Sequence, residues 1–272
     1  LYCYITSYIP GGFSRFAPKK DVLRKLARDV RYANPELHVS MANSSDPYPP
    51  LEARLRLTRR ALEILLGAGF KVLLITKSDL VARDADLLSR GRASVSFTIT
   101  TLDEALAKRL EPGAPPPSSR LKAIRLLTEA GVPCSLRLDP IIPGLNDHEE
   151  EVRRVVREAA RAGAKHVVTS TFKPRHDSVA RMCRAFPDLA KRWRELYYEE
   201  GERVQRARYL PRRLRAEYVR MVKGVTEEEG LTFASCREGF AEWNTATCDG
   251  SHLIPGRPVK VVELGVFFSD ER

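Results

Sequence analysis

Cysteines are the residues in this chain with the clearest capacity for chemistry. The 272 residues include five of them, at positions 3, 134, 183, 236 and 248. An odd number at wide spacing is a poor disulfide framework and favours a protein of the reducing cytoplasm. Cys3 lies between Tyr2 and Tyr4, and its thiolate could ligate a metal, although the same tripeptide also suits a buried strand. Cys134 and Cys183 fall in an expected strand and helix, where we expect core residues.

The other two cysteines lie in a loop-rich segment near the C-terminus. Cys236 and Cys248 are separated by 11 residues, and His252 follows four residues later. This spacing matches no standard zinc pattern. Three interpretations stay open: a second metal or cluster site, a reactive thiol that takes part in catalysis, and two buried structural cysteines.

Polar side chains follow the expected strands at one end. They are Asn43, Ser45 and Asp46; Thr76, Lys77 and Ser78; Thr98 and Thr100; Asp139; and Thr171 and Lys173. In parallel α/β folds the carboxyl ends of the strands carry the site. Helix capping explains some of these residues. Lys77 stands out, because a lysine at the mouth of a buried strand could hold a carboxylate or a ribose.

A recurring unit of helix, glycine and strand must position these residues. The expected strands are 1–9, 38–42, 70–76, 93–100, 132–138 and 166–170, and the first expected helices are 19–33, 51–67 and one opening at a capping box, Thr101–Glu104. Gly69, Gly131 and Gly163 each suit the left-handed end of a helix. Apolar strands of this kind favour a parallel sheet covered on both faces. Six strands before residue 172 fit an open α/β barrel better than a closed eight-stranded one.

Five short motifs in order resemble one family. They are Tyr-Cys-Tyr (2–4), Ser-Asp-Pro-Tyr-Pro-Pro-Leu-Glu (45–52), Ile-Thr-Lys-Ser (75–78), Ser-Phe-Thr-Ile-Thr (96–100) and Arg-Leu-Asp-Pro-Ile-Ile-Pro-Gly-Leu-Asn-Asp (137–147). Over about residues 1–172 the chain is similar to radical S-adenosylmethionine (SAM) enzymes related to spore photoproduct lyase. The resemblance implies a partial (β/α)6 TIM-like barrel in residues 1–174, followed by a mainly helical, basic and loop-rich region in 175–272.

The resemblance also implies cofactors. In this family C-x3-C-x-aromatic-C supplies three thiolates to a [4Fe–4S] cluster, at which SAM is cleaved reductively to a 5′-deoxyadenosyl radical. Cys3 would be the third ligand, and the other two cysteines are expected upstream of Leu1. Ferredoxin or flavodoxin would be the expected electron donor.

Further roles are implied residue by residue. Tyr2 takes the aromatic position beside the adenine, and Tyr4 the place of a tyrosine that helps to pass hydrogen atoms. The positions implied to bind the cofactor are Ser45, Asp46, Lys77, Ser96, Arg137 and Asp139, and Arg120 could assist without belonging to a motif. One departure matters: the hydrogen-donating cysteine of photoproduct lyase is replaced by Asn43. Either no such donor is needed, or another thiol, Cys236 or Cys248, supplies it.

The net charge of +11 is concentrated in one region. Residues 175–223 hold 14 Lys and Arg against 7 Asp and Glu. Arginines interleaved with tyrosines suit a phosphate backbone and stacked bases, and we expect Arg206, Arg212, Arg213 and Arg215 to contact nucleic acid. A solvated helical face is the simpler interpretation.

Three functions therefore compete. The first is a radical SAM enzyme that repairs or modifies nucleic acid. The second is a radical SAM enzyme acting on a protein or small molecule. The third is a non-catalytic nucleic-acid-binding α/β protein. The sequence contains no run of about 18 apolar residues that would indicate a membrane span. We therefore expect a cytoplasmic protein without a membrane partner. The oligomeric state is not indicated.

Overall fold

The fold is built around a parallel sheet. A computed structural model describes residues 1–8, 19–41 and 45–256. Six strands form the sheet in the order β1-β2-β3-β4-β5-β8, and every neighbouring pair is parallel. They are β1 (His38–Met41), β2 (Lys71–Thr76), β3 (Ala93–Thr98), β4 (Cys134–Ile141), β5 (His166–Thr171) and β8 (Thr232–Ser235). The expected α/β architecture with six strands is thus confirmed.

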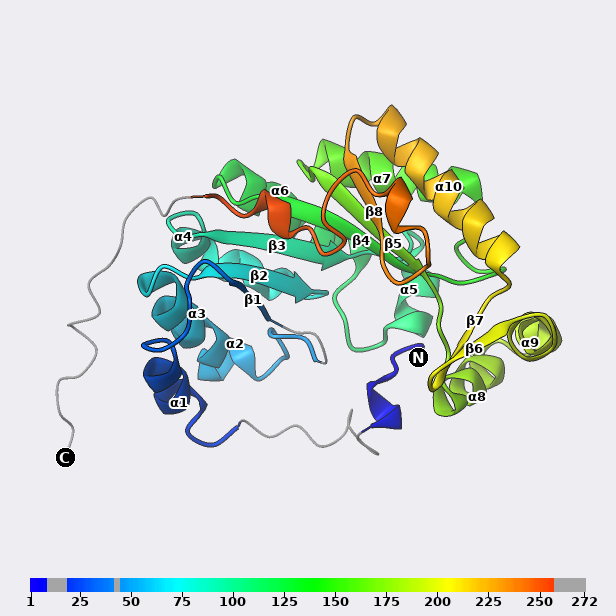
Figure 1. The fold of residues 1–272 in the computed structure, drawn as a ribbon, viewed down its shortest axis with the longest axis horizontal. Helices are drawn as coiled ribbons and strands as arrows, with labels where there is room; N and C mark the ends of the chain where they lie inside the picture. The colour runs from blue at the N-terminus through cyan, green and yellow to red at the C-terminus, as the bar shows by residue number, and fades with distance from the viewer. Residues whose placement is uncertain (9–18, 42–44, 257–272) are drawn as a thin grey trace.

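Helices connect the strands. They are α1 (Val22–Asp29), α2 (Glu52–Leu55), α3 (Leu57–Gly67), α4 (Ala85–Leu88), α5 (Glu104–Leu110), α6 (Pro117–Glu129), α7 (Glu149–Arg161), α8 (His176–Ala185), α9 (Pro187–Arg194) and α10 (Arg212–Glu228). Of these helices, α3, α6 and α10 pack against the sheet, whereas α8 and α9 lie beyond its end near the N-terminus (Figure 1). Shorter turns are η1 (Ile5–Ser7), η2 (Asp79–Asp84), η3 (Glu195–Glu199), η4 (Ala241–Trp243) and η5 (Ser251–Leu253). Within the described residues, no helix combines the length and the apolar composition that crossing a membrane requires.

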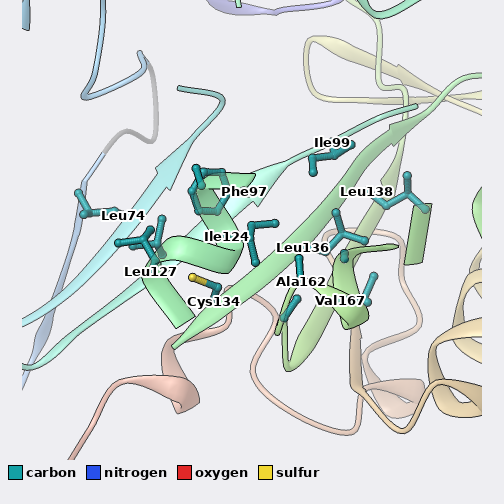
Figure 2. Packing of buried hydrophobic residues seen from close by; sticks show 14 of the residues in the cluster. Leu74, Phe97, Ile99, Ile124, Leu127, Cys134, Leu136, Leu138, Ala162 and Val167 are labelled. Atoms are coloured by element: carbon teal, nitrogen blue, oxygen red, sulfur yellow. The ribbon is translucent and has the colours of Figure 1, made fainter. Parts of the chain in front are cut away.

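The main core lies between the sheet and its helices. Figure 2 shows Phe97 of β3 and Leu136 of β4 against Ile124 and Leu127 of α6, all with no exposed surface. Truncating such a side chain to alanine typically costs about 2–5 kcal/mol. Because successive side chains of a strand alternate between faces, the neighbours of these residues, such as Ser96, point to the opposite, inner face.

The membership of the sheet differs from the expectation in one strand. Residues 1–8 contain no strand, and η1 is a single turn. The side chains of η1 bond to Asp177 of α8, and no strand partner is present in the described residues. The sixth strand is instead β8, whose Thr232 pairs with His166 of β5. β8 follows residue 174, so the sheet takes one strand from beyond the expected end of the barrel region. The division of the chain into two regions at residue 174 stays a prediction.

Two expected helix starts are also corrected. The helix expected at 51–67 is two helices, because Arg56 has a left-handed φ of 51° between α2 and α3. The expected capping box at Thr101 is wrong. Asp103 caps α5 instead, accepting hydrogen bonds from the backbone N–H of Ala105 (2.8 Å) and Leu106 (3.0 Å).

The C-terminal region is mainly helical, as expected, but it also contains short strands. Residues 202–209 form a hairpin of β6 (Glu202–Val204) and β7 (Ala207–Tyr209). Trp193 is 1% exposed and donates to the carbonyl of Pro143 (2.9 Å), as expected of a core residue. Cys134 is buried as expected, whereas Cys183 is only half-buried.

Candidate active site at the carboxyl ends of the strands

The loop that carries Cys3 is held by α8. The Arg181 guanidinium donates to the carbonyls of Leu1 (3.0 Å) and Cys3 (2.7 Å) and pairs with Asp177 (2.8 Å). Asp177 also accepts hydrogen bonds from two hydroxyls of η1. Burial raises the pKa of Asp177, but these donors more than offset it and hold that pKa well below its usual range. A charged pair therefore fixes the backbone on both sides of Tyr2.

Tyr2 is tied to a buried ion pair. Its hydroxyl donates to Glu111, whose other oxygen lies 2.6 Å from the Arg120 guanidinium. Arg120 donates in turn to the carbonyl of Thr98 at the end of β3 (2.8 Å). Burial, followed by the Glu111 carboxylate, raises the pKa of Tyr2, which keeps the phenol a donor. Arg120, for which the sequence offered no motif, thus anchors the Tyr2 ring.

Lys77 reaches the same place from the end of β2. Its ammonium nitrogen lies 5.6 Å from the centroid of the Tyr2 ring. Within the described residues it has no carboxylate partner, so its charge is available to an anionic ligand.

Asp46 lies beside Lys77 but binds the protein. One oxygen accepts from the Thr76 hydroxyl (2.7 Å) and the Tyr48 N–H (2.9 Å), and the other from the Lys77 N–H (2.7 Å). Its carboxylate therefore fixes the end of β2, whereas the neighbouring Ser45 is exposed. Asn43 lies outside the described residues.

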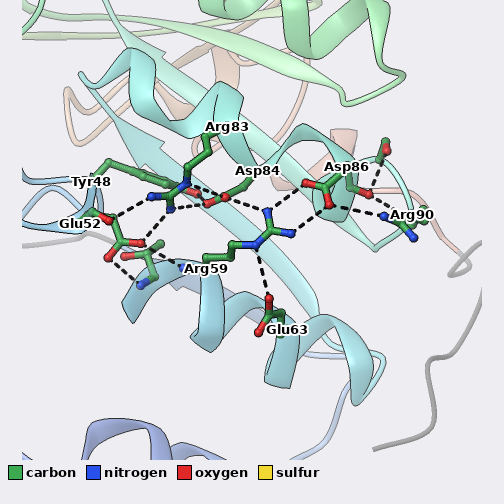
Figure 3. A network of polar contacts seen from close by, with 10 residues as sticks. Tyr48, Glu52, Arg59, Glu63, Arg83, Asp84, Asp86 and Arg90 are labelled. Atoms are coloured by element: carbon green, nitrogen blue, oxygen red, sulfur yellow. Dashed lines mark hydrogen bonds and ion pairs between the residues drawn. The ribbon is translucent and has the colours of Figure 1, made fainter. Parts of the chain in front are cut away.

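The rest of the 45–52 motif belongs to a polar network (Figure 3). Buried Glu52 accepts from Thr58 N–H (2.9 Å) and pairs with Arg83 (2.9 Å). The Tyr48 hydroxyl donates to buried Asp84 (3.1 Å), which also pairs with Arg83 (2.9 Å). This network joins the loop after β1 to η2, the turn that follows β2.

A second group of polar side chains lies at β4 and just after β8. Arg137 pairs with Asp139 (3.1 Å) on β4. Burial lowers the pKa of Arg137, but Asp139 and the Cys236 sulfur more than offset it and raise that pKa. The pKa of Arg237 is likewise raised, with Cys236 as the first cause that opposes burial. The Cys236 sulfur therefore lies beside two guanidinium groups.

The Cys236 loop is fastened to β5 through Glu238. Buried Glu238 accepts from the Thr171 N–H (2.6 Å) and from the Lys173 ammonium. The buried Arg215 donates to the carbonyls of Leu210 (2.9 Å) and Glu238. Arg215 is thus a structural residue, and its expected contact with nucleic acid is wrong because its guanidinium is only 6% exposed.

Tyr4 interacts electrostatically with a member of each group. It is 37% exposed, and its ring centroid is 5.8 Å from the Arg175 guanidinium. Burial raises its pKa; Arg237 lowers it and Cys3 raises it. Tyr4 is therefore within electrostatic reach of both the Cys3 loop and the Cys236 loop.

Among the described residues, hydroxyls without partners lie on β3 and just past its end. The side-chain oxygens of Ser94, Ser96 and Thr100 are buried and make no hydrogen bond to the described residues. Buried polar atoms are nearly always paired, so exceptions mark a place for a ligand or water. Ser96 was the one expected to contact SAM.

The C-terminal thiols do not form a metal site in the part of the chain that the structure describes, where no three His, Cys, Asp or Glu side chains are grouped to hold a metal. Cys248 is exposed by surface area, yet partial desolvation of its thiol, followed by the charge of Cys236, raises its pKa. His252 turns away toward Thr247 (2.9 Å) and His166 (4.7 Å between ring centroids). The proposed second metal site is therefore corrected, while the catalytic roles of Cys236 and Cys248 stay predictions.

The remaining basic residues are spread out. Arg206 is exposed at the turn of the β6–β7 hairpin, and Arg212 and Arg213 are exposed at the start of α10. Their contact with nucleic acid stays a prediction.

Sequence reasoning missed Arg181, Asp177, Glu111, Arg237 and Glu238. Arg181, Asp177, Glu111 and Glu238 act on residues more than 60 positions away in the chain, and short motifs carry no signal for such contacts. Only Arg237 and Glu238 had a local indication, since they directly follow Cys236.

With this geometry in hand, the chain can be placed in a family. It belongs to the Radical SAM superfamily, whose sequence profile matches residues 1–156. An uncharacterized protein of Mycobacterium tuberculosis is 29% identical over 181 residues, covering 64% of this chain and 51% of the relative. One from Methanocaldococcus jannaschii is 36% identical over 112 residues, covering 41% and 43%. A Pseudomonas phage M6 protein named Radical SAM Nalpha-GlyT isomerase is 23% identical over 219 residues, covering 78% and 45%. The chain spans about half the length of these relatives.

Solved structures establish the fold. Spore photoproduct lyase bound to a dinucleoside spore photoproduct aligns with a TM-score of 0.65 at 18% identity, over 86% of this chain and 71% of that one. Streptococcus suis SuiB bound to S-adenosylmethionine aligns with a TM-score of 0.51 at 13% identity, over 83% and 46%. These alignments confirm the partial TIM-like barrel, and membership of the superfamily implies SAM and an iron–sulfur cluster.

The residues present suit these cofactors. A half-buried thiol at Cys3 is the donor type that iron–sulfur clusters use. Lys77 supplies a positive charge for a carboxylate, and Ser96 an unpaired buried hydroxyl.

Proposed function

We propose that this protein binds a [4Fe–4S] cluster through Cys3, with SAM beside it at the carboxyl ends of β2, β3 and β4, and acts on nucleic acid. When bound, the cluster and SAM would supply a reductive cleavage that yields a 5′-deoxyadenosyl radical and removes a hydrogen atom from the substrate. The observation that carries the proposal is the meeting of the Cys3 loop with the Lys77 ammonium over Tyr2.

The chain's own residues would bind and orient SAM. Lys77 would hold its carboxylate, and Tyr2 would pack against the adenine. Arg137 and Asp139, paired at 3.1 Å, would face the ribose, with Ser96 and Ser45 completing the polar lining. Asp46 would act by accepting a hydrogen bond from the Lys77 backbone N–H (2.7 Å), which fixes the end of β2.

Hydrogen transfer to the substrate is assigned to Cys236. Its sulfur lies beside Arg137 and Arg237, at the same strand ends as the cofactor residues. Tyr4 would pass a hydrogen atom between this thiol and the 5′-deoxyadenosyl group. Cys248, whose raised pKa keeps its thiol protonated, is the second candidate.

A nucleic-acid substrate is supported by the basic C-terminal region and by the fold shared with a photoproduct lyase. Arg206, Arg212 and Arg213 would contact its phosphates. Ferredoxin or flavodoxin would donate the electron, and the cytoplasm would provide the reducing environment.

The test is anaerobic reconstitution of the full-length protein with iron, sulfide, SAM and dithionite. The proposal expects 5′-deoxyadenosine, formed faster when a damaged or modified oligonucleotide is present. If peptides accelerate 5′-deoxyadenosine formation and nucleic acid does not, the substrate is a protein or peptide. A cluster-free protein that still binds nucleic acid would favour a non-catalytic role.

A further inference from the structure

A groove lies on the outer side of the Cys236 loop, between α10 and η4. It is an open depression of about 390 Å³ lined by Arg212, Arg213, Ala216, Glu217, Arg220, Phe240, Glu242 and Trp243. We call it the α10–η4 groove. Arg215, in the first turn of α10, donates to the carbonyl of Glu238, two residues after Cys236. The groove therefore adjoins the candidate active site.

Its walls form a four-layer stack. Phe240 and Trp243 are parallel, with ring centroids 4.4 Å apart and an interplanar angle of 5°. The Arg212 guanidinium lies 4.8 Å from the Phe240 ring, and the Arg220 guanidinium lies 4.7 Å from the Trp243 ring. A guanidinium stacked by its face keeps its in-plane N–H groups free to donate.

The charges favour a ligand with more than one anionic group. Arg213 pairs with Glu217 (3.8 Å), whereas Arg212 and Arg220 have no carboxylate partner in the described residues. Two ring layers separate these two guanidinium groups, so a single phosphate cannot contact both. A phosphodiester chain can, because it repeats its charge at regular spacing. Glu242 is exposed at the same groove and would repel such a chain.

We propose that the α10–η4 groove binds the phosphodiester backbone of the nucleic-acid strand that enters the active site, through Arg212 and Arg220. This proposal rests on the proposed nucleic-acid substrate. It adds that the strand is bound by the protein beyond the nucleotide that reacts. The groove does not read bases, because the rings that line it are already stacked.

The test measures binding of a fluorescent single-stranded oligonucleotide to the reconstituted full-length protein across a salt series. The double variant Arg212→Gln, Arg220→Gln should bind about tenfold more weakly at low salt. Its slope of log affinity against log salt should fall by about 1.4, since each lost phosphate contact on a single strand removes about 0.7. Glu242→Gln should act in the opposite direction and tighten binding.

The matched control is Arg60→Gln, Arg125→Gln, two exposed arginines on α3 and α6. This control should leave the slope within about 0.3 of the wild-type value, which is less than half of the roughly 0.7 that one lost phosphate contact removes. A groove variant with the wild-type slope, or a Glu242→Gln protein that binds more weakly, would show that the α10–η4 groove does not bind the backbone. Neither result would contradict the proposed nucleic-acid substrate. A wild-type protein that binds no oligonucleotide overturns both.

Discussion

The Lys77 ammonium lies 5.6 Å from the centroid of the Tyr2 ring, although 74 positions of the chain separate the two residues. One comes from the Cys3 loop and the other from the end of β2. Had they pointed to opposite ends of the sheet, no cofactor site could join them. Their proximity puts a thiol, an aromatic ring and a positive charge into one place, and that charge has no carboxylate partner in the part of the chain that the structure describes.

Lys77→Ala should weaken SAM binding by about tenfold to a hundredfold, because it removes a charged hydrogen bond worth roughly 1.5–3 kcal/mol. Equilibrium binding to the reconstituted protein measures this, while iron and sulfide content should not change. Lys122→Ala, exposed on α6, is the control and should have no effect. Unchanged SAM affinity in Lys77→Ala would remove this residue from the site.

Arg181→Ala should loosen the Cys3 loop, because it deletes the donors to the carbonyls of Leu1 and Cys3. We expect iron to be lost to a chelator about tenfold faster than in wild type, since each charged hydrogen bond contributes about 1.5–3 kcal/mol. Arg184→Ala, exposed on the same helix, should retain iron normally. Equal chelation rates in the two variants would show that α8 does not hold the loop.

Arg215→Gln should lower the free energy of unfolding by about 3–5 kcal/mol, the usual effect of breaking a buried ion pair, here Arg215 with the Glu238 carboxylate (3.8 Å). The exposed Arg213→Gln should change it by less than about 0.5 kcal/mol. Urea unfolding measures both. If Arg215→Gln is as stable as Arg213→Gln and binds nucleic acid less well, Arg215 is not a structural residue and contacts nucleic acid instead.

His166 predicts a pH dependence of stability. Burial, followed by the charge of His252, lowers its pKa to about 4. The unfolded chain, with an ordinary histidine pKa of about 6.5, then binds more protons than the native one between these values. Stability should therefore fall as pH drops from about 6.5 to 4, by up to about 3 kcal/mol from this group. His166→Asn should show a shallower decline in urea unfolding between pH 7 and 5, and equal slopes would contradict the assignment.

Much of the sheet could be predicted from local signals. Gly69, Gly131 and Gly163 all have positive φ before β2, β4 and β5, as their Ala-Gly positions indicated. The same unit occurs at Gly230, with φ of 71° before β8, and would have identified the sixth strand. Residues 1–8 were misassigned because Tyr and Ile suit a strand and a packed loop equally, and a contact with α8 decides between them.

The site was predictable where a motif fixed it and not elsewhere. Lys77 and Tyr2 were found from motif positions, and the structure brings them together. Arg215 was misjudged because an arginine's burial depends on partners such as Glu238, which lies 23 positions away. Composition gives the number of arginines but not which of them are exposed.

The central claim is that Cys3 ligates a cluster at which SAM is cleaved. Its most direct test is the iron content and 5′-deoxyadenosine yield of the full-length protein, compared with Cys3→Ser and Cys236→Ser. We predict that Cys3→Ser loses iron and forms no deoxyadenosine, whereas Cys236→Ser keeps its iron and still cleaves SAM. A Cys3→Ser protein that retains wild-type iron and deoxyadenosine formation would contradict the account.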